Sequence, residues 1–242
     1  EGIITLMEGD FLLKEGRLTG KALRVPHARF ATHGVALVKS GWGVEVVLVP
    51  LDYARIEHDM NVAREARDTL TFERVVAETG WIELPANGLR LFGAMARAVQ
   101  MAGALDYLTT QSVAYANERT QFGKPIGKFQ AIQQQLAVLS TQSAAAGIAA
   151  AHACAAADKG EAAFEIAVAK VRADDASSIA TSIAHQVHGA IGFTYEHGLH
   201  FATRRLWAWR AEFGSGAEWA EELGRAAMER GADELWPYVT GR

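Results

Sequence analysis

The spacing of hydrophobic residues changes about one third of the way along the chain. Up to about Pro85, apolar and polar residues alternate in short runs at residues 10–26, 34–51 and 67–78. Alternation with a period of two is typical of half-buried strands, and Gly and Pro residues break these runs. Turn residues at 15–16 and at 40–43 predict hairpins. We therefore expect an antiparallel β-sandwich or barrel in this part.

Beyond Pro85 the apolar residues recur at helical spacing, as in Leu91, Met95, Ala98 and Leu105. The pattern predicts long helices at residues 88–118, 126–158 and 161–188, then shorter ones at 196–210 and 216–230. Ser215 and Glu218 have the spacing of a capping box. Short connections between long amphipathic helices favour an antiparallel four-helix bundle. We predict an α+β chain with a β-domain at 1–85 and a bundle domain at 86–242.

Composition narrows the class of protein. The 242 residues, half of them hydrophobic, are enough for one large or two modest domains. A net charge of −4 and a pI near 6.1 are unlike a nucleic-acid-binding protein. Cys154 is the single cysteine, which suits a reducing cytoplasm. We expect no membrane span and no signal peptide. The chain does not begin with Met, which fits a processed or partial form of something longer.

The first candidate site is the corner between the two longest predicted helices, "ERTQFGKP". Arg119 carries a planar fork of donors that matches phosphate or carboxylate, and it lies at a helix C-terminus. Gln121 adds an amide, Phe122 a flat apolar surface, and Gly123 permits close approach of the backbone. A ligand-binding corner and a well-capped helical hairpin both explain this composition.

A second polar corner, "HQVHGAIGF" at residues 185–193, follows the third predicted long helix. It again combines a glutamine, Gln186, with glycines at 189 and 192 and an aromatic, Phe193. A glycine C-cap is the plain structural explanation, and close approach of a ligand is the functional one. We expect the two corners to lie at opposite ends of the bundle.

The sequence "RTQFGKPIGKFQAIQQQLA", with Tyr115 four residues before its arginine, strongly resembles the acyl-CoA dehydrogenase family. "QVHGAIGF" is close to the Gln-x-x-Gly-Gly-x-Gly pattern of the same family. The order of a β-domain followed by a bundle also fits. The resemblance implies α,β-dehydrogenation of an acyl-CoA thioester with FAD, and electron-transfer flavoprotein as the acceptor.

In this family the two corners bind the adenosine diphosphate end of an FAD that is held mainly by a neighbouring subunit. The resemblance therefore implies oligomerisation, as a homo-oligomer or as a heterotetramer with a paralogue. Arg119 would pair with the pyrophosphate, while Gln121 and Phe122 would contact the adenosine side. The second corner would approach the diphosphate through Gln186, Val187, Gly189 and Ala190.

The sequence departs from the family where the chemistry is done. The position of the usual catalytic glutamate is Phe213, and Glu212 lies one residue earlier. The alternative position for the base, on the first bundle helix, is near Gly93. The strand segment Trp-Ile-Thr beside the flavin reads Arg24-Val25-Pro26 here, and the second glycine after Gln186 is Ala190. The N-terminal helical domain of the family is absent from this sequence.

These departures favour a subunit that lacks its own catalytic base and completes the FAD site of a partner, as in heteromeric family members acting on steroid side chains. One alternative is a self-sufficient enzyme in which Glu212 is the catalytic residue. Another is a scaffold that no longer binds flavin, and a nitroalkane-type flavin oxidase is a more distant one. Glu196, His197 and His200 lack the His-Glu-x-x-His order of zinc enzymes, so we expect no metal site.

Overall fold

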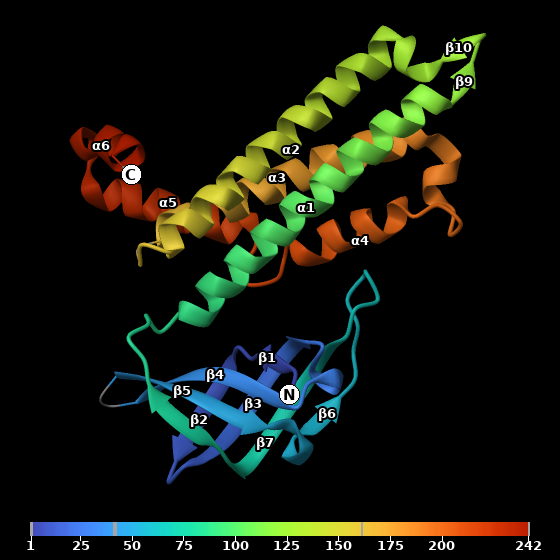
Figure 1. The fold of residues 1–242 in the computed structure, drawn as a ribbon. Coiled ribbons are helices and arrows are strands. Elements are labelled where there is room, and N and C mark those ends of the chain that lie inside the picture. Colours follow the sequence, from blue (N-terminus) through green and yellow to red (C-terminus); the bar gives the residue numbers. More distant parts are fainter. Residues whose placement is uncertain (1, 41–42, 161, 242) are drawn as a thin grey trace. The chain divides into compact units, whose positions relative to one another are not determined.

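The chain divides into two units, Glu1–Gly93 and Ala94–Arg242, which we call the β unit and the helical unit. The computed structural model describes residues 2–40, 43–160 and 162–241. The predicted α+β class, with strands first and helices second, is confirmed (Figure 1). Helix α1 (Gly88–Glu118) begins at the end of the β unit and continues into the helical unit.

The β unit contains two four-stranded sheets. The first has the order β1-β4-β5-β8, with bounds Ile4–Leu6, His33–Ser40, Gly43–Pro50 and Glu78–Trp81. The second has the order β2-β3-β7-β6, with bounds Gly9–Lys14, Arg17–Pro26, Arg67–Val76 and Arg55–Glu57. The short helices η1 (Ala28–Phe30) and η2 (Leu51–Tyr53) lie between strands. All strand pairs in these sheets are antiparallel except β1 with β4, which is a parallel pair that the alternation did not predict.

Both predicted hairpins form. Lys14 pairs with Arg17, and the turn residues Glu15 and Gly16 both have positive φ, 53° and 69°. This is the backbone of a type I′ turn, which matches the twist of the flanking strands. Strands β4 and β5 pair from His33 with Pro50 to Ser40 with Gly43. Residues 41–42, where we expected the turn, lie outside the described residues.

Alternate residues of the strands fill the space between the sheets. Leu18 and Val25 of β3 and Leu70 and Phe72 of β7 are buried, together with Val47 and Val49 of β5. Each large apolar side chain buried in this way stabilises the fold by roughly 1.5–3 kcal/mol. The alternation in the sequence is therefore the direct cause of the two-layer arrangement.

Asp68, near the start of β7, forms an ion pair with Arg29. The Asp68 carboxylate is 0% exposed and accepts hydrogen bonds from the backbone N–H groups of Arg29 (2.9 Å) and Asp59 (3.1 Å). The Arg29 guanidinium also donates to it, with its Nε at 3.1 Å. Burial by itself would raise the pKa of Asp68, but the hydrogen bonds from Arg29 outweigh it, and the pKa lies below its ordinary value.

The helical unit is built on three long helices, α1, α2 (Gln130–Ala157) and α3 (Ala163–His188). Between α1 and α2 lie the two-residue strands β9 (Thr120–Gln121) and β10 (Lys124–Pro125) and the short helix η3 (Ile126–Lys128). After α3 come η4 (Gly189–Phe193), α4 (Leu199–Trp209), α5 (Gly216–Arg230), η5 (Ala232–Glu234) and α6 (Leu235–Thr240). Within the described residues, no helix is long and apolar enough to cross a membrane.

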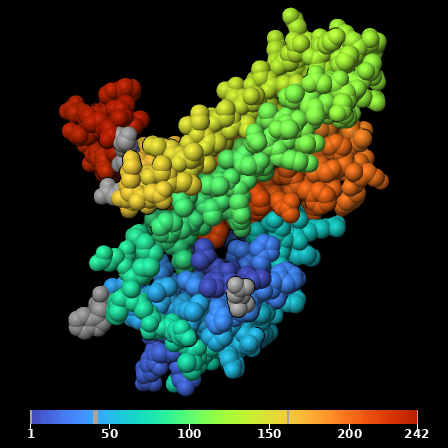
Figure 2. All heavy atoms as spheres, in the orientation of Figure 1, coloured from blue at the N-terminus to red at the C-terminus, as the bar shows by residue number. Residues whose placement is uncertain are grey.

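The helix ends match the sequence at some places and differ at others. Helix α5 has the predicted bounds and the predicted capping box of Ser215 and Glu218. Helix α2 begins four residues later than predicted, because Phe129 is extended (φ −89°, ψ 131°) and separates η3 from it. Glu161, the predicted first residue of the third helix, lies outside the described residues. Helix α6 was not predicted; in Figure 2 the C-terminal residues, in red, stand out from the yellow and green helices.

We predict that Asp68→Asn lowers the free energy of unfolding of the β unit by about 2–3 kcal/mol, because Arg29 loses its charged partner in a buried site. Since the pKa of Asp68 is lowered on folding, this contribution is full above about pH 4 and is lost as the pH falls further. Urea unfolding at pH 7 and at pH 3.5 measures both effects. The matched control is Glu57→Gln, which removes an exposed pair with Arg55. Equal losses in the two variants at pH 7 would contradict the prediction.

Candidate functional site

The first corner is a strained hairpin with an exposed aromatic at its tip. Phe122 and Gly123 have φ values of 52° and 78°, and they connect β9 to β10. Phe122 is 92% exposed, and its ring meets the ring of Phe129 edge-on, with 6.2 Å between the centroids. A left-handed conformation costs a bulky residue roughly 1–2 kcal/mol. The turn at Glu15 and Gly16 has similar φ values, so the feature that distinguishes this corner is the exposed aromatic ring at its tip.

Two polar side chains flank this tip. Arg119 is exposed, and no hydrogen bond or ion pair engages its guanidinium within the part of the chain that the structure describes. Gln121 is also exposed, and its amide donates to the carbonyl of Thr120 at 2.8 Å. The backbone of Arg119 is fixed, since its N–H donates to Tyr115 and its carbonyl accepts from Ile126. The corner thus presents a free cation on a rigid frame.

The second corner borders a groove of about 600 Å³ at the end of α3. The groove is lined by Ser178, Thr181, Ser182, His185, Gln186, Gly189, Ala190, Phe193 and Trp207. Three predicted residues, Gln186, Gly189 and Ala190, therefore lie together on its surface. The side chain of Val187 is 4% exposed and packs into the bundle. Val187 supports the corner from inside, and its side chain does not line the groove.

The two corners lie at the same end of the helical unit, and the expectation of opposite ends was wrong. Helix α2 runs antiparallel to both α1 and α3, so α1 and α3 run in the same direction and end together (Figure 1). Tyr115, in the last turn of α1, stacks on His188, the last residue of α3, with ring centroids 4.6 Å apart and planes at 22°. Two reversals of direction, from α1 to α2 and from α2 to α3, bring the chain back to the end where α1 stops.

Histidines form much of the contact between the corners. His188 is buried; its Nδ1 lies 2.8 Å from the Ala184 carbonyl, and His197 meets its ring edge at 4.8 Å. Burial lowers the pKa of His188, so its neutral form is favoured. His185 stacks on the exposed Phe193, with centroids 4.3 Å apart. Among the described residues, no group of three or more His, Cys, Asp or Glu side chains has the arrangement of a metal site.

The connection between α4 and α5 contains Glu212, the candidate catalytic residue. Its carboxylate accepts a hydrogen bond from Nε of Arg97, on α1, at 2.6 Å. Phe213, at the expected position of the family's base, has a φ of 56°, and its carbonyl accepts from the indole of Trp219 at 3.0 Å. The Arg97 guanidinium also lies over the ring of Phe213, at 5.9 Å from the centroid. Glu212 and Phe213 are thus parts of one packed cluster with Arg97.

Two charged residues of α3 hold both ends of this connection. Lys170 is 0% exposed, and its ammonium donates to the carbonyls of Arg210 and Gly214, each at 2.7 Å. One turn later, Asp174 accepts from the Arg210 guanidinium and from the backbone N–H of Gly216, the latter at 2.9 Å. Burial lowers the pKa of Lys170 to about 8, against the opposing effects of Asp174 and Glu212.

The sequence did not predict this cluster or the place of Trp207 in the groove, whereas His185 and Phe193 belong to the corner that it did predict. Lys170 lies on the same stripe of α3 as the buried Ala173, Ala176 and Ala180. A charged residue on the small-residue face of a helix was the available signal, because it requires a buried partner. The partners are 40 or more residues away in the sequence, so their identity was not accessible from spacing.

The two corners fit an adenosine diphosphate group. A Cβ built on Gly123 or on Gly189 meets no atom within 4 Å, so neither glycine is required by packing within the chain. Both have positive φ and expose bare backbone to open space. A free guanidinium, exposed amides and accessible backbone are the donors that a diphosphate requires, and Phe122 offers a flat surface to a purine.

Comparison with known proteins identifies the family. Residues 89–228 match the family model described as "Acyl-CoA dehydrogenase, C-terminal domain", which is 140 of the 242 residues. The chain therefore belongs to the acyl-CoA dehydrogenase family, and the predicted family is confirmed. Members of this family generally bind FAD, and an FAD complex of PigA is among the similar structures (TM-score 0.76, 20% identity, covering 93% of this chain and 64% of that one).

Two relatives come from Mycobacterium tuberculosis. Acyl-CoA dehydrogenase IpdE2 is 33% identical over 152 residues, covering 63% of this chain and 44% of the relative. Acyl-CoA dehydrogenase FadE34 is 31% identical over 211 residues, covering 82% and 30%. The chain spans less than half the length of either. The fold is also that of the ChsE4-ChsE5 complex from the same organism, with a TM-score of 0.86 at 21% identity, covering 96% of this chain and 68% of that one.

We predict that unfolding free energy rises with pH between about 8 and 10, by up to roughly 3 kcal/mol, because of Lys170. Its pKa is lower in the folded chain, so the unfolded chain binds more protons in that window. Lys170→Met removes this rise. At pH 7 it costs about 1–3 kcal/mol, since two carbonyls lose their donor. Urea unfolding at pH 7, 8, 9 and 10 tests this, with the exposed Lys159→Met as control. An unchanged slope in Lys170→Met would contradict the assignment.

Proposed function

We propose that the chain is a subunit of an acyl-CoA dehydrogenase that completes the FAD site of a neighbouring subunit and has no catalytic base of its own. The observation that carries the proposal is the pair of corners at one end of the helical unit. Each presents the open backbone of a glycine and exposed polar side chains to the outside, and packing within the chain requires neither Gly123 nor Gly189. Such an arrangement is explained by a ligand that belongs mostly to another chain.

The roles of the corner residues follow from their chemistry. Arg119 pairs with the diphosphate, and Phe122 and Gln121 lie against the adenosine. Gln186 and the backbone at Gly189 and Ala190 approach the diphosphate from the groove. FAD, when bound, supplies the hydride acceptor for α,β-dehydrogenation of an acyl-CoA thioester. Electron-transfer flavoprotein is the acceptor that the family resemblance supports.

The proposal that the base is missing rests on Glu212 and Phe213. A general base must reach the substrate's α-proton and must be free to accept it. The carboxylate of Glu212 is instead bonded to Arg97 within the packed α4–α5 connection. Phe213 occupies the family's base position with an apolar ring. The base would therefore come from the partner chain.

A heteromer with a base-bearing paralogue is the assembly that best accommodates these features. The fold match with the ChsE4-ChsE5 complex, which contains two different chains, supports it. A homo-oligomer would place two base-less sites together and would then depend on Glu212. We place the protein in the cytoplasm, in agreement with its single cysteine.

We predict that the chain purified alone is colourless, and that co-expression with the product of its neighbouring gene gives a heteromer with the visible absorbance of flavin. Native mass and the spectrum of both preparations test this.

In the heteromer, Arg119→Met weakens FAD binding roughly tenfold or more, since a charge-assisted contact is worth about 1.5–3 kcal/mol. Arg225→Met, on α5 and paired with Glu221, is the matched control. Absence of flavin from both preparations would favour the scaffold alternative.

A second prediction separates a structural role of Glu212 from a catalytic one. Glu212→Gln keeps the shape of the side chain and removes the charge that pairs with Arg97. We expect it to lower the free energy of unfolding by about 1–3 kcal/mol, with turnover of the flavin-loaded heteromer changed less than about threefold. Steady-state dehydrogenation of an acyl-CoA and urea unfolding give the two readouts. A loss of turnover beyond about a hundredfold with normal stability would establish Glu212 as the base.

A further inference from the structure

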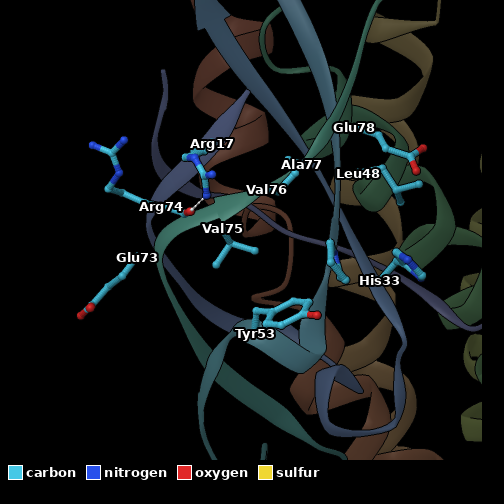
Figure 3. Close-up of a pocket in the computed structure, with 11 residues that line it drawn as sticks. Arg17, His33, Leu48, Tyr53, Glu73, Arg74, Val75, Val76, Ala77 and Glu78 are labelled. Carbon is cyan, nitrogen blue, oxygen red and sulfur yellow. Dashed lines mark hydrogen bonds between the residues drawn. The ribbon is translucent and has the colours of Figure 1, made fainter. Parts of the chain in front are cut away.

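A second cavity, of about 650 Å³, lies within the β unit, and no residue of the helical unit lines it (Figure 3). It opens where β7 passes from the second sheet toward β8 in the first. Its apolar wall includes Leu48 of β5 and the buried Val75 of β7. The volume is within the range of pockets that hold small organic ligands. Most of the lining residues belong to strands, which hold the cavity open without a ligand.

Three polar side chains meet the apolar wall. Arg17 begins β3, and one of its guanidinium nitrogens donates to the Arg74 carbonyl at 3.2 Å, the dashed line in Figure 3. That bond uses one of the guanidinium's five N–H donors, and the exposed side chain can direct others toward a ligand. Tyr53, on η2, is 73% exposed and lies across the cavity with its hydroxyl on the side of His33 (Figure 3). The Nδ1 atom of His33 is hydrogen-bonded to the Thr32 hydroxyl at 3.0 Å, so its Nε2 atom is the one that can contact a ligand.

The charges at the rim limit the ligand's own charge. Arg74 and Glu73 line the rim, but their side chains point away from the other labelled residues in Figure 3. Glu78 adds a second carboxylate from β8. The two guanidinium groups and the two carboxylates among the lining residues cancel, so the cavity as a whole carries no net charge. A ligand with a single negative charge can pair with Arg17 alone, whereas a dianionic phosphate or a coenzyme A thioester would meet carboxylate repulsion that the site does not offset.

We infer that this cavity binds a small amphipathic monocarboxylate. Its carboxylate pairs with the Arg17 guanidinium, and its apolar part lies against Leu48, Val75 and the ring of Tyr53. The fork of an arginine matches the two oxygens of a carboxylate, and an apolar wall beside it selects a hydrocarbon chain or ring. The site is a binding site only, and no bond is made or broken in it.

The test uses the full chain and sodium decanoate, measured by isothermal titration calorimetry. We expect saturable binding with a Kd below about 1 mM, and a loss of roughly tenfold or more in Arg17→Met. Arg55→Met is the matched control: Arg55 is an exposed arginine on β6 that pairs with Glu57 and does not line the cavity. It should bind like the original chain. Equal losses in the two variants would overturn the assignment of the carboxylate to Arg17.

Two further ligands and one spectroscopic probe complete the test. Decanol is neutral and decyl phosphate is a dianion near neutral pH, whereas decanoate carries a single negative charge. Both should therefore bind at least about fivefold more weakly than decanoate. Tighter binding of either overturns the inferred class. Arg17→Met also removes the hydrogen bond to Arg74 and could lower binding by perturbing the fold. A probe that needs no substitution at Arg17 is therefore added: the unsubstituted chain is labelled with 3-fluorotyrosine. The resonance lost in Tyr53→Phe should shift on addition of decanoate, and a resonance that does not move overturns the proposal.

Discussion

The direction of three helices decides where the candidate cofactor site is built. Because α2 returns antiparallel between α1 and α3, the C-terminal ends of α1 and α3 coincide, and the stack of Tyr115 on His188 joins them. The strained tip at Phe122 and the groove beside Gly189 belong to these two ends. Without that coincidence, the corners would be separate helix stops with ordinary capping explanations. With it, a cation, amides and bare backbone are available to one ligand.

The fold and the corners were predictable because each depends on local pattern. The period of two predicted the strands, the period near 3.6 predicted the helices, and Gly16 marked the place of the first hairpin turn. The corners were recognisable because residues with hydrogen-bond donors, such as Arg119 and Gln121, interrupt the helical pattern. Family resemblance then assigned them a ligand class. Features that depend on residues close together in the sequence could therefore be predicted from the sequence.

It was insufficient where distant residues meet. Arg97 and Glu212 are 115 positions apart, and Asp174 reaches Arg210 across 36. On the sequence, Glu212 was a displaced catalytic carboxylate; in the structure, it is the partner of Arg97. The parallel pairing of β1 with β4 and the shared end of α1 and α3 are likewise matters of topology. A single sequence does not specify which elements are neighbours, and that information decides the role of a charged residue.

Some glycines are required by packing within the chain, whereas others border open space that a ligand can enter. Gly216 stands against Asp174, and a Cβ there would collide with the carboxylate, so internal packing requires it. Gly123 and Gly189 have positive φ and open space where a Cβ would be. Gly189 also serves the chain as the C-cap of α3, where its N–H donates to the His185 carbonyl, but the space that a Cβ would fill is open at both glycines. That open space, with the exposed Phe122 beside Gly123, supports the proposal that both corners contact a ligand shared with a neighbouring subunit.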